Sequence, residues 1–248
     1  MRIIPVIDLR DGRAVSGRAG DRERYVPVWS VLAAGAPGDP AALLAAYRAA
    51  LRPDTVYIAD LDRIMGGGDN DAVLEVLMTH APDARFLWDG GFSDTVALSR
   101  RGRDGRLVPV IATETLRSIE DLRAPREPCV PGAVLSLDLR AAGVVSRSGA
   151  LSSLGEEEIL LRARACGFRS VILLLLDRVG TSSGLPLDRL IRLRGLASDL
   201  DLLAGGGIAS LDDLLRLRDA GFSGALVATA LHEGLISPGD LERHGFTA

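Results

Sequence analysis

The chain has 248 residues, and 47% of them are hydrophobic, which is enough for a large buried core. Its formal net charge of −4 argues against sequence-independent binding of nucleic acid, because such binding needs a basic face. All 29 basic residues are arginines. Chemistry that depends on a lysine, as in Schiff-base aldolases, pyridoxal-phosphate enzymes and P-loop nucleotide hydrolases, is therefore excluded.

The apolar runs, cysteines and histidines do not point to a membrane, a metal or an oxidising compartment. The apolar run at 171–176 is far too short to cross a bilayer, and residues 1–5 enter a strand-like run without the pattern of a signal peptide. Neither the cysteines nor the histidines have a metal-binding or redox spacing; they are Cys129, Cys166, His80, His232 and His244. We expect a cytoplasmic protein without a metal site, whose histidines lie at the surface or pack locally.

The first half alternates apolar segments with helix signals. Strands are predicted at 3–8, 55–61, 85–88 and 107–112, because each is apolar enough to be buried on both faces. Asp39 and Pro40 are typical of a helix start, and this helix should run to about residue 51. Further helices should begin near Asn70 and Ser118. The polar, glycine-rich stretch 9–38 is too long for an ordinary loop, so it forms either a lid or a small hairpin.

The second half repeats this rhythm, with strands predicted at 133–138, 171–176, 201–204 and 225–228. Helices should open at Gly155, near Leu185, at Ser210 and near Pro238. Eight buried strands that alternate with helices imply a parallel α/β sheet, and eight such units in this length fit a single-domain, eight-stranded TIM barrel. An open, doubly wound sheet is the alternative, but the first turn lacks the Gly-x-Gly-x-x-Gly pattern.

Several motifs recur at one offset, which indicates that the barrel is built from two duplicated half-barrels, at about 1–125 and 126–248. Gly91 and Gly207 lie 116 residues apart, as do Thr113 and Thr229. The sequence Leu-Asp-Arg occurs at 61–63 and again at 176–178. Since no linker or change of composition divides the chain, both halves belong to one domain.

Each half has a glycine turn after its third strand and an Ala-Thr pair at the end of its fourth. Backbone N–H groups at such turns can bind a phosphate without any lysine. The candidate phosphate-binding residues are Gly90, Gly91 and Thr113 in the first half, and Gly206, Gly207 and Thr229 in the second. The second site is the stronger candidate, because Asp89 stands beside the first pair of glycines and would repel an anion. Glycine pairs also serve tight turns, which is the structural alternative.

Two carboxylates are the candidate catalytic residues. Asp8 ends the first strand and Asp138 the fifth, so they would face each other across the mouth of the barrel, where the active sites of this fold lie. One could act as general acid and the other as general base if their pKa values differ. The alternative is that each caps a turn or pairs with a nearby arginine. Asp62 could contact a substrate, although its counterpart Asp177 indicates a shared structural role.

Taken in order, these motifs resemble the histidine-biosynthesis barrel isomerases, the phosphoribosylformimino-aminoimidazole-carboxamide-ribotide isomerases. The resemblance covers nearly the whole chain and rests on residues 3–9, 60–62, 136–138, 180–181, 204–207 and 212–214. It implies an Amadori aldose-to-ketose rearrangement of a substrate with a phosphate at each end, with Asp8 as general base and Asp138 as general acid. It also implies substrate contacts near Gly180 and Thr181, and it implies no cofactor.

The chain departs from that family in several places. Its sixth strand ends in Leu-Leu-Leu at 174–176 and is followed by Val-Gly-Thr at 179–181, where the isomerases typically have Thr-Asp-Ile and then Asp-Gly-Thr. Ser16 and Ala19 stand where the family has Arg and Gln, and the related cyclase has a lysine near Ser16. Residues 20–28 instead look like a branch of isomerase-related proteins that is often associated with one-carbon cofactor metabolism.

The leading hypothesis is an isomerase-like barrel enzyme, a divergent paralogue that acts on a phosphorylated, sugar-derived metabolite by Asp/Asp acid–base catalysis. The histidine-pathway isomerase itself is the first alternative. A non-catalytic protein that binds a phosphorylated ligand is the second, and it would keep the glycine turns but could lose either acid. We expect a monomer or small homo-oligomer whose partner is a phosphorylated small molecule, not a nucleic acid or a membrane.

Overall fold

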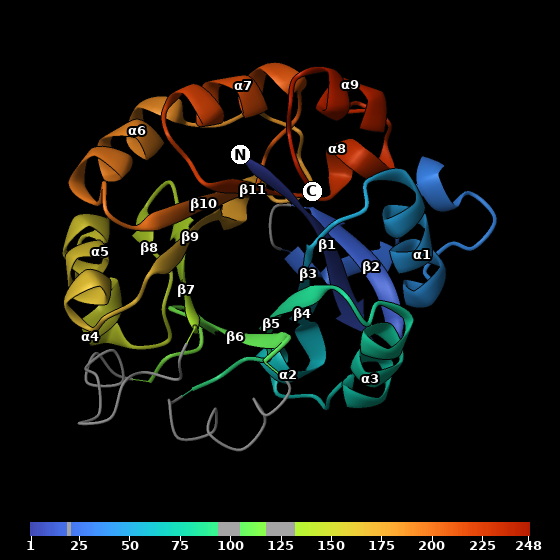
Figure 1. Cartoon of the computed structure of the whole chain (residues 1–248). Helices are drawn as coiled ribbons and strands as arrows, with labels where there is room; N and C mark the ends of the chain where they lie inside the picture. Colours follow the sequence, from blue (N-terminus) through green and yellow to red (C-terminus); the bar gives the residue numbers. More distant parts are fainter. Residues whose placement is uncertain (19–20, 94–104, 118–131) are drawn as a thin grey trace.

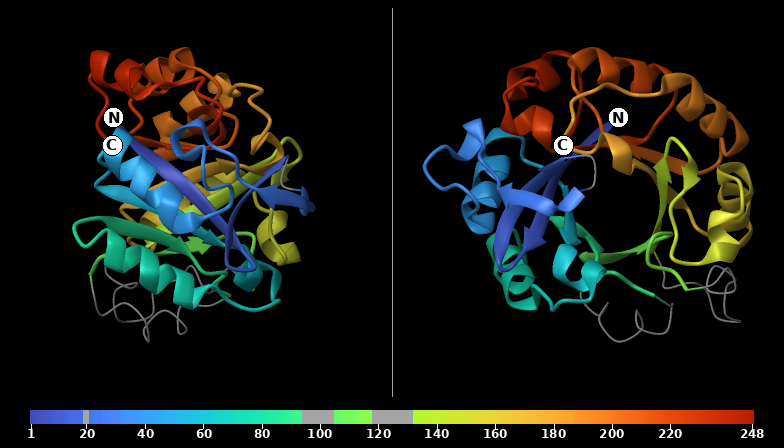
Figure 2. Two further views of the ribbon diagram at one scale, coloured as in Figure 1. Left: turned by 90° about the vertical axis from the view of Figure 1, so that its right-hand side faces the viewer. Right: turned by 180° about the vertical axis from the view of Figure 1, so that it is seen from behind.

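The structure is a computed structural model that describes residues 1–18, 21–93, 105–117 and 132–248. Eight parallel strands form a closed barrel that is surrounded by helices (Figure 1 and Figure 2). Around the ring the strands follow the order β1, β4, β5, β6, β7, β9, β10 and β11, and the pairing of β11 with β1 closes it. The predicted single-domain TIM barrel is therefore confirmed, and the open sheet is wrong.

The barrel strands agree with the predicted segments within two residues at each end. They are β1 (Arg2–Arg10), β4 (Thr55–Asp60), β5 (Arg85–Asp89), β6 (Leu107–Ala112), β7 (Val134–Arg140), β9 (Ser170–Leu175), β10 (Asp201–Gly205) and β11 (Gly224–Val227). β4 and β9 end one residue earlier than predicted, because Leu61 already begins a helix and Leu176 begins a 3-10 turn.

The described helices lie on the outside of the barrel or at its mouth. They are α1 (Pro40–Ala50), α2 (Leu61–Met65), α3 (Asp71–His80), α4 (Gly149–Ser152), α5 (Glu156–Ala165), α6 (Leu187–Leu196), α7 (Leu211–Asp219), α8 (Thr229–His232) and α9 (Pro238–Arg243). The short α2, α4 and α8 are absent from the prediction. The helix expected near Ser118, like Cys129, lies outside the described residues. No described helix combines the length and the apolar character that crossing a bilayer would need.

Side-chain caps fix two of the predicted helix starts. Asp39 accepts hydrogen bonds from the N–H groups of Ala41 and Ala42, at 2.9 and 3.0 Å, so α1 begins as predicted. Ser210 and Asp213 form a capping box at the start of α7, in which each side chain satisfies a backbone N–H of the other.

The long polar stretch after β1 contains a hairpin, which decides between the two alternatives. β2 (Arg13–Arg18) pairs antiparallel with β1 and with β3 (Asp21–Pro27), so that Asp8 lies opposite Val15. A much shorter strand, β8 (Gly143–Val144), folds back on β7 in the same way and pairs with Leu139. Both strands that carry the candidate acids therefore continue into antiparallel extensions at the mouth of the barrel.

Apolar side chains fill both faces of the barrel wall. One buried cluster takes a side chain from each of the eight strands, which places it inside the ring; it includes Ile4, Tyr57, Leu87, Val110, Val134, Ile172, Leu203 and Leu226. Neighbouring strand residues, such as Ile3 and Phe86, belong to the larger cluster beneath the helices. All six residues of β4 are buried, so the strands are apolar without alternation because both faces are covered.

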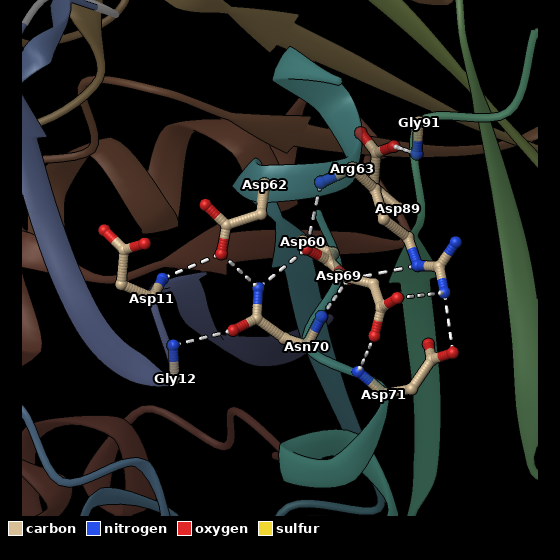
Figure 3. A network of polar contacts seen from close by, with 10 residues as sticks. All are labelled: Asp11, Gly12, Asp60, Asp62, Arg63, Asp69, Asn70, Asp71, Asp89 and Gly91. Carbon is tan, nitrogen blue, oxygen red and sulfur yellow. Dashed lines mark hydrogen bonds and ion pairs between the residues drawn. The ribbon is translucent and has the colours of Figure 1, made fainter. Parts of the chain in front are cut away.

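A buried polar network ties the turn after β1 to the segment after β4 (Figure 3). Asp60 is only 1% exposed, and its carboxylate accepts hydrogen bonds from the Arg63 N–H and from the backbone and side-chain N–H groups of Asn70. Asn70 also donates to Asp62 at 2.9 Å, and its Oδ1 accepts the N–H of Gly12 at 2.9 Å. Asn70 precedes α3 as predicted, but its side chain makes no capping bond because this network occupies it.

The repeated Leu-Asp-Arg sequence makes one and the same contact in both halves. Asp62 accepts the N–H of Asp11 at 2.7 Å, and Asp177 accepts the N–H of Ala141 at 2.8 Å. Asp11 and Ala141 lie in the turns that follow β1 and β7. The two aspartates therefore hold the turns directly beyond the strands that carry the candidate acids.

This network gives a prediction for stability. Asn70→Ala should lower the free energy of unfolding by about 1–3 kcal/mol, because a buried carboxylate loses a donor and the Gly12 N–H loses its acceptor. The matched control is Glu75→Ala, at an exposed position on α3, which should change stability by at most about 0.5 kcal/mol. Urea unfolding followed by circular dichroism measures both, and equal small changes would contradict the role given to Asn70.

Candidate functional site

A cavity opens at the carboxyl ends of the barrel strands. Residues of β1, β4, β5, β7, β9 and β11 line it, together with residues that follow β6 and β10. The β2–β3 hairpin contributes Ser16, Gly17 and Tyr25 to its wall. Four carboxyl side chains belong to the lining: Asp8, Asp89, Glu114 and Asp138.

The two candidate acids lie on opposite sides of this cavity. Asp8 is on β1 and Asp138 is on β7, and three barrel strands separate β1 from β7 in either direction around the ring. Asp8 is half-buried, whereas Asp138 is only 1% exposed. The structure thus brings both residues to one cavity, from opposite sides of the ring.

Hydrogen bonds from β6 and β7 hold the carboxyl group of Asp138. Its Oδ1 accepts the Ser136 hydroxyl at 2.7 Å, and its Oδ2 accepts the Glu114 N–H at 2.9 Å. Thr113 adds two contacts, since its hydroxyl accepts the Asp138 N–H at 2.9 Å and donates weakly to Oδ2 at 3.4 Å. Thr113, a predicted phosphate contact, is thereby fully buried beneath Asp138.

Burial raises the pKa of Asp138 to about 8, and repulsion from Glu114 and Asp89 acts in the same direction. The hydrogen bonds from Ser136 and from the Glu114 N–H favour the charged form and oppose the rise, without cancelling it. Asp138 therefore keeps its proton at neutral pH. A protonated carboxyl group that faces a cavity has what a general acid needs.

Tyr57 lies between the carboxylates on the wall formed by β4. Its hydroxyl donates to Asp89 Oδ2 at 3.3 Å. Burial raises the pKa of Tyr57 well above its usual value, and the charges of Asp89, Asp138 and Asp8 raise it further. Three carboxyl groups thus act on one phenol. Sequence reasoning treats Tyr57 only as part of a buried strand, although a polar-tipped side chain in such a run is a usable signal.

In the first glycine turn, the backbone makes its contacts within the protein. The N–H of Gly91 donates to Asp89 Oδ1 at 3.1 Å. Gly91 has φ +65°, and a Cβ there would lie 2.9 Å from backbone atoms of Ile64. A Cβ on Gly90 would press on the ring of Trp88, at 2.8 Å. Tight packing requires these glycines, and neither belongs to the cavity lining.

In the second glycine turn, Gly206 and Gly207 line the cavity. Their φ angles are +86° and +87°, which favour glycine. A Cβ would lie 2.3 Å from the Leu175 carbonyl oxygen at the first position and 2.8 Å from the Arg178 side chain at the second. Thr229, at the start of α8, lines the cavity too. Close packing therefore requires glycine at both positions, as it does in the first turn, but here the glycines also form part of the cavity wall.

The loop after β9 runs beside the second glycine turn. Gly180 and Ser182 line the cavity, and Ser182 has the unusual φ of +46° for a residue with a side chain. Its buried Oγ has no hydrogen-bond partner in the described part of the chain. Thr181 instead donates to the Arg178 carbonyl at 2.9 Å, and neither Thr181 nor Asp62 belongs to the cavity lining.

His232 differs from the other two histidines. It is 6% exposed, it lines the cavity from α8, and it stacks on Tyr47 with its Nε2 3.3 Å from the Tyr47 hydroxyl. Burial lowers its pKa to about 4, so it is neutral at physiological pH. Its buried Nδ1 has no partner among the residues that the structure describes. The sequence analysis expects only a surface or packing role for His232 and does not predict its place in the cavity wall.

Four carboxyl groups belong to the described lining of the cavity, and no arginine does. Within the described ranges, no group of three or more histidine, cysteine, aspartate or glutamate side chains could hold a metal ion.

Known proteins resemble this chain over its whole length. A family model described as histidine biosynthesis protein matches residues 2–237. An uncharacterized protein of Methanocaldococcus jannaschii is 33% identical over 247 residues, which cover 98% of this chain and 96% of that protein. A protein of Thermus thermophilus named 1-(5-phosphoribosyl)-5-((5-phosphoribosylamino)methylideneamino) imidazole-4-carboxamide isomerase is 34% identical over 244 residues, covering 95% and 96%.

The raised pKa of Asp138 predicts how stability depends on pH. Between about pH 4 and pH 8 the folded state holds a proton on Asp138 that the unfolded chain has lost, so the contribution of this group to stability falls as the pH rises, by up to about 1.4 kcal/mol per pH unit. Asp138→Asn should remove this contribution, and the exposed control Asp188→Asn should keep it. The lowered pKa of His232 acts in the opposite direction below about pH 6.5, equally in all three proteins. Urea unfolding of the three proteins from pH 5 to pH 8 measures the slopes. Parallel curves for the wild type and Asp138→Asn would refute the assignment.

Proposed function

Because the chain belongs to the histidine biosynthesis protein family, we propose that it is a divergent barrel enzyme of that family. It isomerises a phosphorylated, sugar-derived metabolite by acid–base catalysis at Asp8 and Asp138. The observation that carries this proposal is the position of the buried, hydrogen-bonded Asp138 opposite Asp8, in a cavity that the second glycine turn also lines.

In this proposal the two acids have different tasks. Asp138 donates its proton to the ring oxygen of the sugar and so assists ring opening. Asp8 then takes the proton from the carbon next to the anomeric carbon, which gives an enol. Loss of the enol hydroxyl proton and addition of a proton to the anomeric carbon turn this aldose derivative into a ketose derivative. The different burial of the two carboxyl groups supports this division, since Asp138 is 1% exposed among donors and neighbouring acids whereas Asp8 is half-buried.

The phosphate of the substrate is assigned to the second glycine turn. Gly206 and Gly207 line the cavity, and backbone N–H groups at such a turn can bind a phosphate. The Ser182 hydroxyl supplies a buried donor without a protein partner in the described part of the chain. Thr229 and Gly180 complete this side of the cavity.

The chain is one domain of two half-barrels, 1–125 and 126–248, in this proposal, and the matching contacts of Asp62 and Asp177 support it. The proposal places the protein with the branch associated with one-carbon cofactor metabolism, on the strength of residues 20–28. It takes the protein to be a monomer or small homo-oligomer.

The main alternative is the histidine-pathway isomerase itself. The name of the Thermus thermophilus relative favours it. Against it stands the end of β9, where Leu174 and Leu176 line the cavity and offer no hydroxyl or carboxylate. Complementation of an isomerase-deficient histidine auxotroph separates the two, and we expect no growth although the protein is expressed and folded. Growth at the rate given by the authentic isomerase would establish the alternative.

The acid–base assignment predicts the behaviour of two variants. Asp8→Asn and Asp138→Asn should each lower kcat by about 10²–10⁴ on phosphorylated aldosylamines, because general acid–base catalysis contributes that much. Nuclear magnetic resonance in D₂O follows both ketose formation and exchange of the adjacent carbon-bound proton, and Asp8→Asn should abolish the exchange. Asp188→Asn, on an exposed helix position, is the control. Full turnover by both variants would refute the assignment of Asp8 and Asp138 as base and acid.

The phosphate assignment is tested with inorganic phosphate. Gly207→Ala should weaken its binding at least tenfold in isothermal titration calorimetry, because the new Cβ would collide with Arg178 and the Gly184 carbonyl. Gly195→Ala, at an open position in α6, is the matched control. Ser182→Ala provides a second variant without backbone change and should weaken binding severalfold. Unchanged affinity in both site variants would remove phosphate from this turn.

A further inference from the structure

A second cavity opens at the other end of the barrel, where the strands begin; we call it the N-terminal mouth. The polar residues of its lining are Arg2, Thr55, Arg85 and Ser170, which are the first residues of β1, β4, β5 and β9. Its volume is about 80 Å³, which is room for several water molecules and hence for one small ion. The candidate acids lie at the opposite end of the same strands, so this cavity is separate from theirs.

The alternation of side chains along the strands explains why these residues face the inside of the ring. Residues two apart on a strand share a face. The inner apolar cluster takes one side chain from each strand, and the residues two positions earlier form the next layer toward the N-terminal mouth. On β1, β4 and β5 this layer consists of Arg2, Thr55 and Arg85. Because β4 lies between β1 and β5, Thr55 comes from the strand between the two arginines.

The two arginines of the N-terminal mouth have no acidic partner. Neither guanidinium group forms an ion pair or a hydrogen bond with a residue that the structure describes, and the described lining contains no carboxyl side chain. Asp54, which precedes β4, and Asp201, on β10, are exposed and lie outside this lining. Asp201 accepts the hydroxyl of Ser223 at 3.1 Å. Arg2 and Arg85 therefore give one small cavity a positive potential.

Thr55 adds a buried hydroxyl to this cavity. Thr55 is only 4% exposed, and its hydroxyl makes no hydrogen bond within the described part of the chain. A buried hydroxyl is costly unless water or a ligand meets it. Since Thr55 lines the cavity, an oxygen atom bound there can accept its proton. Ser170 supplies a second, half-buried hydroxyl from the opposite side of the ring.

A covering role for the arginines explains only part of this arrangement. Their aliphatic stems can shield the inner apolar layer while the charged heads reach water. That role needs neither two charges at one cavity nor an unused hydroxyl on the strand between them. Guanidinium groups bind oxyanions through pairs of hydrogen bonds, and a tetrahedral oxyanion has enough oxygen atoms for both arginines and for Thr55.

We propose that the N-terminal mouth is an anion site, at which Arg2, Arg85 and Thr55 bind a free, doubly charged tetrahedral oxyanion of the sulfate or phosphate type. Two guanidinium groups balance its two charges, and the size of the cavity suits a single ion of this kind. The site is distinct from the phosphate site at the second glycine turn and does not depend on the proposed function.

Sulfate is the probe, and isothermal titration calorimetry of the intact protein at pH 7 and constant ionic strength measures its binding. Arg2→Gln and Arg85→Gln should each weaken sulfate binding at the N-terminal mouth at least tenfold. The matched control is Arg169→Gln, which loses the same charge at the same end of the barrel but lies outside the lining, and it should leave binding unchanged. Crystals soaked in selenate should show an anomalous peak between Arg2, Thr55 and Arg85.

Thr55→Val guards against effects on the fold, because it removes only a hydroxyl that bonds to no described residue. It should weaken sulfate binding severalfold and leave the midpoint of urea unfolding unchanged. Binding that survives both arginine variants, or that falls equally in Arg169→Gln, overturns the proposal, as does a selenate-soaked crystal without a peak at the N-terminal mouth. Sulfate binding that Gly207→Ala alone removes would support the phosphate site of the proposed function and overturn this one.

Discussion

The buried carboxyl group of Asp138 is the constraint on which the rest of the site depends. It sits inside a barrel wall where a charge is costly, so its surroundings decide whether it is an acid or a base. Ser136 and the Glu114 N–H fix its two oxygens, and Thr113 fixes its backbone N–H. These contacts require β6 and β7 to lie in one register, which the pairing of Ala112 with Ser136 provides. The parallel barrel is therefore a condition for the proton on Asp138.

The turns beyond β1 and β7 depend on hydrogen bonds to side chains, because they have little apolar surface to bury. Asp62 and Asp177 supply them by accepting one backbone N–H each. In the first half the network is larger, since Asn70 and the buried Asp60 join it and hold the start of the β2–β3 hairpin (Figure 3). Charged side chains close to the cavity thus serve the scaffold, which separates them from the acids that face the ligand.

The sequence is informative about the barrel because each strand is buried on both faces and each helix start has its own local signal, as at Asp39 and Ser210. Local signals also place Asp8 and Asp138 at strand ends. They do not reveal contacts that form only when the ring closes. His232 meets Tyr47 across 185 residues of chain, and the pKa of Asp138 depends on Glu114 and Asp89 from neighbouring strands. The hydrogen bond of Asn70 with Gly12 also forms only in the folded chain, whereas the sequence around Asn70 indicates a helix cap.

A duplicated barrel has two equivalent anion sites only while both turns leave their N–H groups to the ligand. In this chain the second turn meets that condition, with glycine at positions 205, 206 and 207, and the first does not, because Asp89 takes the N–H of Gly91. The same substitution adds a carboxylate to the arc that already contains Asp8 and Asp138 and so helps to keep Asp138 protonated. Asp89 thus acts both on the backbone of the first turn and on the pKa of Asp138.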